Sequence, residues 1–240
     1  MKVVGTPMRR SVLIVKCGST QREVAAKFGD YETWFIRGLG GDPAHFTVVA
    51  PQKSEPFPDP LRCAAILATG SPSSILEHRP WMAETGAYLL GAAEKGVPVL
   101  GVCFGHQLLA DALGAPVQRN PRGREFGTVD VDLTAEGQRH PLFRGLSARA
   151  TFQTVHEDEV VALPAGSVLL AGNPHSPIQA FQYGTSLLAV QFHPELWLEP
   201  VKAIAAERRI APQQYRAEET PAGRTLLMNF HEHYVLPREN

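Results

Sequence analysis

The chain has 240 residues, a formal net charge of −1 and an isoelectric point near 6.8. It lacks the basic excess that nucleic acids or anionic membranes would require, and its 44% hydrophobic and 20% charged residues are typical of a globular protein. No apolar run approaches the ~20 residues of a membrane-spanning helix. We therefore expect one domain over residues 1–240, with a core at about 11–236, that binds neither nucleic acid nor membrane.

The cysteine count and the N-terminal residues indicate the cellular compartment in which the protein is expected. The three cysteines are widely spaced and odd in number, which argues against a disulfide framework and for reducing conditions. The apolar stretch within residues 1–10 is too short for a secretory signal. We expect a cytoplasmic protein.

The first half of the chain alternates short apolar runs with helical patterns. Strands are expected at residues 11–16, 46–50, 64–68 and 97–102. Helices are expected near residues 21–37, 79–95 and 104–113. This alternation predicts parallel strands joined by helices.

The pattern changes after Gly123. Residues 127–133 alternate apolar and polar side chains, as a half-exposed antiparallel strand does. Further strands are expected at 150–155, 168–171, 178–183 and 187–191, and helices near 199–209 and 222–235. The predicted fold is three-layer α/β, flavodoxin-like, with a mostly parallel central sheet flanked by helices and a small antiparallel extension around 127–183. Its active site should lie at the carboxyl ends of the strands.

Cys103 is the candidate nucleophile. It stands between an apolar strand and a helix in Gly101-Val102-Cys103-Phe104-Gly105, the pattern of a nucleophile elbow with Cys in place of Ser. The tight turn needs small neighbours two residues away on either side. The N-terminus of the following helix favours a thiolate and offers N–H groups to an oxyanion.

His193-Pro194-Glu195 supplies a base and a carboxylate that orients it. In an extended segment, residues two apart point to the same side, so the two side chains are expected to hydrogen-bond. His106 follows the nucleophile on a helix and points about 100° away, so it is not expected to be the base. The other histidines show no metal-ligand spacing, and we expect neither a metal nor another cofactor.

These two motifs, about ninety residues apart, resemble the class I glutamine amidotransferase family over nearly the whole chain. Thr69-Gly70-Ser71-Pro72 is similar to that family's oxyanion-strand motif. Within the family, the sequence looks closest to the glutaminase domain of GMP synthase and its stand-alone relatives. The resemblance implies that Cys103 attacks the side-chain amide of glutamine, forming a γ-glutamyl thioester, and that His193, oriented by Glu195, moves the proton.

The resemblance also implies roles for other residues. Backbone N–H groups of Gly70 and Phe104 would form the oxyanion hole, and Gln107 would contact the substrate. The segment Val155-His156-Glu157-Asp158 is similar to one whose backbone holds the amino-acid end of glutamine. Val155 and Glu157 depart from the family pattern, which often has a small polar residue and a glycine there. Val155, Glu157 and Asp158 are therefore expected to line the substrate site with altered contacts.

Three alternatives remain open. The first is a glutaminase that passes ammonia to a partner synthase chain, since the sequence has no ATP-type phosphate loop and no room for a synthase domain. The second is a free-standing hydrolase of γ-glutamyl peptides or amines, whose larger pocket would be shaped by the extra segment 197–221. The third is a non-catalytic or redox-sensing relative, which the intact His193 and Glu195 argue against.

Overall fold

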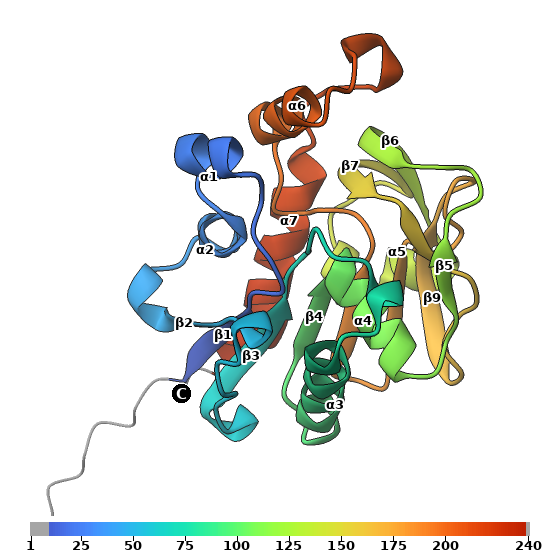
Figure 1. The fold of residues 1–240 in the computed structure, drawn as a ribbon. Coiled ribbons are helices and arrows are strands. Elements are labelled where there is room, and N and C mark those ends of the chain that lie inside the picture. Colours follow the sequence, from blue (N-terminus) through green and yellow to red (C-terminus); the bar gives the residue numbers. More distant parts are fainter. Residues whose placement is uncertain (1–9, 239–240) are drawn as a thin grey trace, which may run out of the picture.

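A single large sheet runs through the computed structural model, which describes residues 10–238 (Figure 1). Most of residues 1–10, where no secretory signal is expected, therefore lies outside it. The nine strands run in the order β2-β1-β3-β4-β11-β10-β9-β6-β7. They are β1 Ser11–Val15, β2 Phe46–Val49, β3 Cys63–Ala68, β4 Val99–Val102, β6 Glu125–Leu133, β7 Arg149–His156, β9 Ser167–Gly172, β10 Ala180–Tyr183 and β11 Leu187–Val190. A separate antiparallel pair comprises β5 Val117–Arg119 and β8 Asp158–Val160.

Helices cover both faces of this sheet and complete the three layers. The helices of the structure are α1 Arg22–Phe28, α2 Tyr31–Leu39, α3 Pro80–Glu94, α4 Phe104–Ala112, α5 Ala135–Arg139, α6 Leu198–Glu207 and α7 Pro221–Phe230, which continues into a π-helical turn at His231–Val235. Apolar residues of α3 and α4 pack in one core cluster, and those of α2 and α7 pack in the other. The predicted three-layer α/β class is confirmed.

The sheet has a parallel half and an antiparallel half. Strands β2, β1, β3, β4 and β11 pair in parallel, whereas β10, β9, β6 and β7 pair antiparallel. The predicted extension around residues 127–183 therefore continues the central sheet through β10, which pairs with both β11 and β9.

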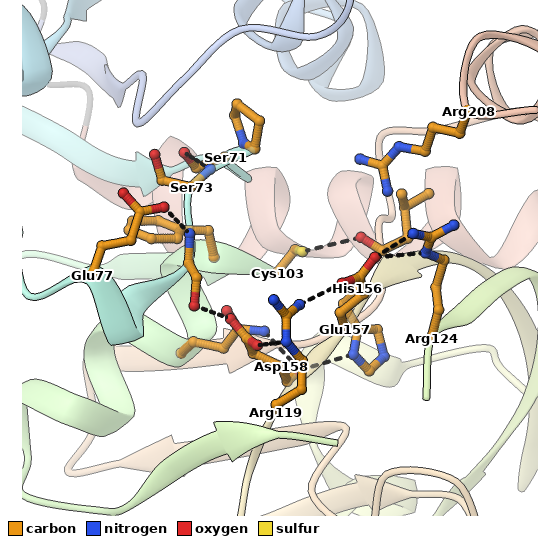
Figure 2. Close-up of a pocket in the computed structure, with 15 residues that line it drawn as sticks. Ser71, Ser73, Glu77, Cys103, Arg119, Arg124, His156, Glu157, Asp158 and Arg208 are labelled. Atoms are coloured by element: carbon orange, nitrogen blue, oxygen red, sulfur yellow. Dashed lines mark hydrogen bonds and ion pairs between the residues drawn. The ribbon is translucent and has the colours of Figure 1, made fainter. Parts of the chain in front are cut away.

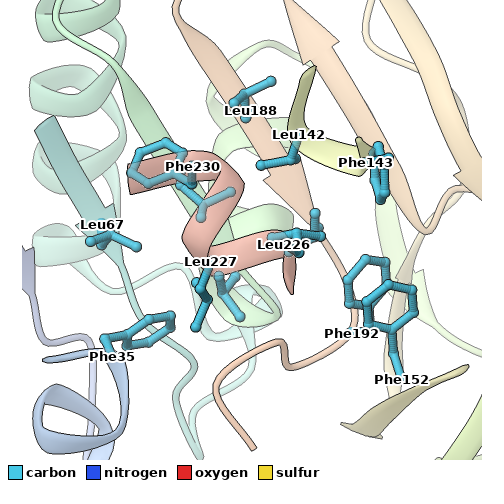
Figure 3. Close-up of a cluster of buried hydrophobic side chains, with 14 of the residues drawn as sticks. Phe35, Leu67, Leu142, Phe143, Phe152, Leu188, Phe192, Leu226, Leu227 and Phe230 are labelled. Atoms are coloured by element: carbon cyan, nitrogen blue, oxygen red, sulfur yellow. The ribbon is translucent and has the colours of Figure 1, made fainter. Parts of the chain in front are cut away.

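Strand β1 shows why the parallel half reads as unbroken apolar runs. Val12 and Ile14 face the cluster that α7 covers, while Leu13 and Val15 face the cluster on the opposite side. Successive residues of a strand point to opposite faces, so a sheet covered on both sides needs apolar residues at every position. Figure 3 shows side chains of α7, including Phe230, packed in the first of these clusters.

One expectation was wrong in detail, because residues 21–37 form two helices. Gly29 has a φ of 82°, outside the helical region, and ends α1. Asp30 then caps α2, since its carboxylate accepts from the N–H of Tyr31 at 2.9 Å and from that of Thr20 at 2.8 Å. The three-residue strands β5 and β8 were not predicted, because so short a run carries no period.

No helix within residues 10–238 is long and apolar enough to cross a membrane.

Candidate active site

Cys103 occupies a sharp turn between β4 and α4. Its φ of 54° and ψ of −101° lie where residues with side chains are rarely found, so the backbone is strained there. Two hydrogen bonds hold the turn: the Cys103 N–H donates to the carbonyl of Val190 at 2.9 Å, and the Gln107 N–H donates to the carbonyl of Cys103 at 3.1 Å. The neighbouring strand β11 and the first turn of α4 therefore fix the thiol at the strand end.

The flanking glycines are required by close contacts. A Cβ on Gly101 would lie 2.6 Å from the carbonyl oxygen of Gly105, and a Cβ on Gly105 would lie 2.5 Å from that of Ala68. Both distances are too short for any side chain. This is the steric reason, expected from the sequence, for small residues on either side of Cys103.

His193 and Glu195 follow β11 and form the expected hydrogen bond. The imidazole Nδ1 lies 2.7 Å from Oε1 of Glu195, and both side chains are buried. The His193 backbone N–H donates to the carbonyl of Gln153 in β7 at 2.8 Å, which fixes the histidine from the antiparallel half. Because Nδ1 donates to Glu195, Nε2 is the nitrogen left for Cys103.

The charges around His193 favour the imidazolium. Burial by itself opposes the positive charge, but the negative charges of Cys103 and Glu195 outweigh it and raise the pKa of His193 to about 10. Cys103 therefore lies beside a histidine whose protonated form the site favours.

Gly70 and Phe104 lie beside the thiol. A Cβ on Gly70 would be 3.0 Å from Cε1 of His193 and 3.8 Å from Cβ of Cys103, so the backbone after β3 passes directly over this pair. Phe104 begins α4, where backbone N–H groups have no partner within the helix. The two predicted oxyanion-hole residues therefore meet at Cys103.

A cavity of about 460 Å³ opens in front of Cys103 (Figure 2). Gln107 lines it, but the amide of Gln107 donates to the carbonyl of Asp158 at 2.9 Å and to Oε1 of Gln191 at 3.1 Å. Both amide protons of Gln107 are therefore used in hydrogen bonds within the protein, and these bonds stabilise the cavity wall.

The segment from Val155 to Asp158 forms the opposite wall. The carbonyl oxygen of Val155 lies 3.9 Å from Sγ of Cys103. The carboxylate of Glu157 binds Arg119 and Arg124, while that of Asp158 accepts from the hydroxyl of Ser74 at 2.5 Å. These side chains are paired within the protein, so the backbone is the part of the segment that faces the thiol.

A buried hydrogen bond between His156 and Glu125 supports this wall from behind. His156 Nδ1 donates to the carbonyl of Asp158 at 3.0 Å, and its Nε2 lies 2.7 Å from a carboxylate oxygen of Glu125. Both neighbours are oxygen atoms, so each ring nitrogen of His156 has a hydrogen-bond partner. The pKa of Glu125 is lowered: burial acts against the carboxylate, but His156, Asn173 and Gln179 together stabilise it.

The remaining thiols and His106 are unsuited to catalysis. Burial raises the pKa of Cys17 to about 12 and that of Cys63 to about 11. Burial, with a smaller contribution from His156, lowers the pKa of His106 to about 3, and its ring packs against Phe181. Within residues 10–238, no group of three His, Cys, Asp or Glu side chains is arranged to hold a metal ion.

Some residues around the cavity carried no local signal in the sequence. Arg119 and Arg124 reach it from β5 and the start of β6, and Arg208 reaches it from the end of α6. Gln153 was likewise not singled out. Only Arg208 belongs to a segment, 197–221, that the sequence had associated with the pocket.

Residues 33–209 match the model of the family described as glutamine amidotransferase class-I. This chain belongs to that family. It is 31% identical over 171 residues to a subunit of the glutamine-hydrolysing GMP synthase of Saccharolobus solfataricus, a match that covers 70% of this chain and 85% of that one. It is 38% identical over 142 residues to the GMP synthase of Thermomicrobium roseum.

The Thermomicrobium match covers 58% of this chain but only 24% of the longer enzyme. The chain thus spans about a quarter of that relative. Among solved structures, a glutamine amidotransferase from Thermotoga maritima has a TM-score of 0.72 at 20% identity, covering 95% of this chain and 99% of the other. That likeness is one of fold.

Proposed function

We propose that this amidotransferase-family protein hydrolyses the side-chain amide of glutamine through a Cys103-His193-Glu195 triad. The observation that carries the proposal is the strained elbow cysteine paired with a buried histidine whose Nδ1 is 2.7 Å from a carboxylate. A nucleophile, a base and a group that orients the base are the minimum set for acyl transfer.

The proposed reaction proceeds in two steps. The thiolate of Cys103 attacks the amide carbon, and the oxygen is stabilised by the backbone N–H groups of Gly70 and Phe104. The C–N bond breaks as the imidazolium of His193 gives its proton to the leaving nitrogen, which departs as ammonia. Water then attacks the γ-glutamyl thioester, His193 takes its proton, and glutamate leaves as the C–S bond breaks.

The substrate would lie in the 460 Å³ cavity, with its amino-acid end along the backbone of residues 155–158. In this proposal Gln107, Val155, Glu157 and Asp158 act mainly by shaping that wall. Their side-chain bonds to Gln191, the arginines and Ser74 support such a positioning role.

The space beside His193 supports ammonia as the leaving group. A second cavity of about 20 Å³ is lined by His193, Tyr31, Leu196 and Ile204, and it meets the first at Cys103. About 10–15 Å³ of such volume is enough for one water molecule, which is similar in size to ammonia. The nitrogen that accepts the proton from His193 must lie on this side.

The fate of the ammonia belongs to the same proposal. Two relatives are named as single subunits of a glutamine-hydrolysing GMP synthase, which supports a partner synthase chain that receives the ammonia. Without such a partner, the ammonia would be released into solution and the protein would act as a glutaminase.

A second candidate is a free-standing hydrolase of γ-glutamyl peptides or amines. The width of the 460 Å³ cavity and its arginine-lined rim favour it, since they offer room and charge beyond the needs of a primary amide.

The two candidates are separated by measuring glutamate release from L-glutamine and from a panel of γ-glutamyl dipeptides, with Cys103→Ala as control. We expect glutamine to be turned over and the control to be inactive. Preferential turnover of dipeptides would replace the first candidate with the second. If no substrate turns over and a glutamine-like electrophile does not label Cys103, the catalytic proposal is wrong.

A further inference from the structure

Arg208 comes from a helix that is firmly anchored beside the cavity. Val201 and Ile204 of α6 pack in a buried cluster with Val24 of α1 and with Trp34 of α2. Before the helix, the ring of Trp197 lies under the guanidinium of Arg37, whose central carbon is 4.1 Å from the ring centroid. The end of α6 is therefore held in a fixed position.

The end of α6 has a defined cap. The Arg209 N–H donates to the carbonyl of Ala206 at 3.0 Å, and the Ile210 N–H donates to that of Ala205 at 2.8 Å. This is a Schellman arrangement, with Arg209 in the left-handed position at a φ of 54°. A non-glycine residue there costs about 1 kcal/mol, and the cap fixes Arg208 as the last residue before the turn.

The guanidinium of Arg208 has no carboxylate partner among residues 10–238. Arg119 and Arg124 both bind Glu157, whereas Arg208, although half-buried, makes no hydrogen bond or ion pair with the part of the chain that the structure describes. Five N–H donors in a planar fork are thus left for another acceptor. Burial and the nearby charge of Arg124 lower the pKa of Arg208 from its ordinary value, which agrees with a cation that the protein does not fully compensate.

The position of Arg208 is equally informative. It lines both the 460 Å³ cavity and the small cavity beside His193, as do Cys103 and Val155. Figure 2 shows its side chain directed into the space between Cys103 and Arg124. A substrate that reacts with Cys103 therefore lies near the Arg208 guanidinium, whether most of the substrate occupies the larger or the smaller cavity.

We propose that Arg208 binds a carboxylate of the substrate and so restricts the enzyme to amides that carry a free carboxylate near the scissile bond. A planar guanidinium and a carboxylate form two parallel hydrogen bonds, the geometry that lysine cannot reproduce. The carboxylate belongs either to the amino-acid end of the glutamyl group or to an amino-acid leaving group. The inference rests on the hydrolysis proposed above.

The experiment compares matched substrates with and without each carboxylate. L-glutamine is paired with 4-aminobutanamide, which lacks the α-carboxylate, and γ-glutamylglycine is paired with γ-glutamylglycinamide. Each is tested with the wild-type protein, Arg208→Gln, Arg208→Lys and Arg209→Gln, which makes the same change one residue further on at an exposed position. Ammonia or glutamate release gives kcat/KM.

We expect Arg208→Gln to lower kcat/KM by about 10- to 100-fold for the substrate that has the bound carboxylate and to leave its counterpart unchanged. If kcat/KM falls for glutamine but not for 4-aminobutanamide, Arg208 binds the α-carboxylate. If it falls for γ-glutamylglycine but not for γ-glutamylglycinamide, Arg208 binds the carboxylate of the leaving group. Arg208→Lys should lower the same kcat/KM by a smaller factor, and Arg209→Gln should leave it unchanged. Equal loss on both members of each pair, or no loss, overturns the proposal.

A second readout does not depend on turnover. Iodoacetate and iodoacetamide both alkylate a reactive cysteine, but only iodoacetate carries a carboxylate. We expect Arg208→Gln to reduce the ratio of their Cys103 alkylation rates, measured by mass spectrometry, about 10-fold relative to wild type. An unchanged ratio contradicts the role of Arg208. If the ratio falls but the protein cleaves no γ-glutamyl amide, Arg208 binds carboxylates and the proposed hydrolysis is wrong. If Arg208→Gln fails to fold, the same comparisons with Arg208→Lys decide.

Discussion

The parallel and antiparallel halves of the sheet contribute different parts of the site. Cys103 follows β4, Gly70 follows β3 and His193 follows β11, so the proposed chemical groups all come from the carboxyl ends of parallel strands. The antiparallel half and the separate β5–β8 pair supply the wall: Val155 lies on β7, Asp158 begins β8, and the hydrogen bond between His156 and Glu125 joins β7 to β6.

This difference has a physical basis. Parallel strands carry buried apolar side chains on both faces, so polar groups of this half are confined to the strand ends, where loops and helix N-termini can satisfy them. Antiparallel strands tolerate polar residues along their length. Buried Glu125 and His156 bind each other there, and buried Gln153 donates to the carbonyl of Glu218. The first half should therefore control the rate, and the second should control substrate binding.

Cys103→Ala is expected to have the largest effect, because it removes the nucleophile from the parallel half. Glutamate release should fall by about 10⁴-fold or more. Cys63→Ala, the same change at the amino end of the neighbouring strand β3, should retain activity. A Cys103→Ala protein with more than a few per cent of wild-type turnover would contradict the proposed mechanism.

Glu195→Gln tests the charge of the orienting group. The amide can still accept from Nδ1 of His193 and place its NH₂ at the position of Oε2, which has no hydrogen-bond partner among residues 10–238. The geometry is kept while the negative charge is lost, so kcat should fall about 100-fold with little change in KM. Glu207→Gln, an exposed change on α6, is the control. A normal kcat would show that the carboxylate charge is dispensable.

Glu125→Gln weakens the support of the antiparallel wall. His156 loses its hydrogen bond to a buried carboxylate, and losing a hydrogen bond to a charged group costs about 2 kcal/mol of unfolding free energy. The KM for glutamine should rise about 10-fold because the segment from Val155 to Asp158 shifts, while kcat stays within a few-fold. Urea unfolding and steady-state kinetics measure both. Asp130→Asn, an exposed change on the same strand, should change neither the unfolding free energy nor the KM.

The charge state of His193 is tested by titration and needs no measurement of turnover. Its folded pKa, about 10, exceeds the ordinary value near 6.5, so its contribution to stability is fully present below pH 6.5 and is lost as the pH rises toward 10. NMR titration of the imidazole should show protonation at neutral pH in the wild type. In Cys103→Ala, where the charge of Cys103 is gone and burial still opposes the imidazolium, the pKa should be lower. An unchanged titration would disprove the coupling.

Much of this molecule was readable from the sequence because the signals were local. The strands of the parallel half are continuous apolar runs. The elbow around Cys103 can be identified from its glycines and from the strand and helix patterns that flank it. The His193 and Glu195 pair could be predicted since two residues in an extended segment face the same side. These features depend only on neighbours in the chain.

Other features were decided by contacts between distant segments. The break at Gly29 and Asp30 depends on the cap that Asp30 forms and on its ion pair with Lys16, and the clamp from Gln153 to His193 joins segments forty residues apart. Arg208 reaches the cavity, without an ion-pair partner among residues 10–238, because α6 packs against α1. The sequence by itself determined the layers, the candidate nucleophile and the histidine–glutamate pair; the tertiary structure decided which charges line the cavity, since that requires segments far apart in the chain to come together.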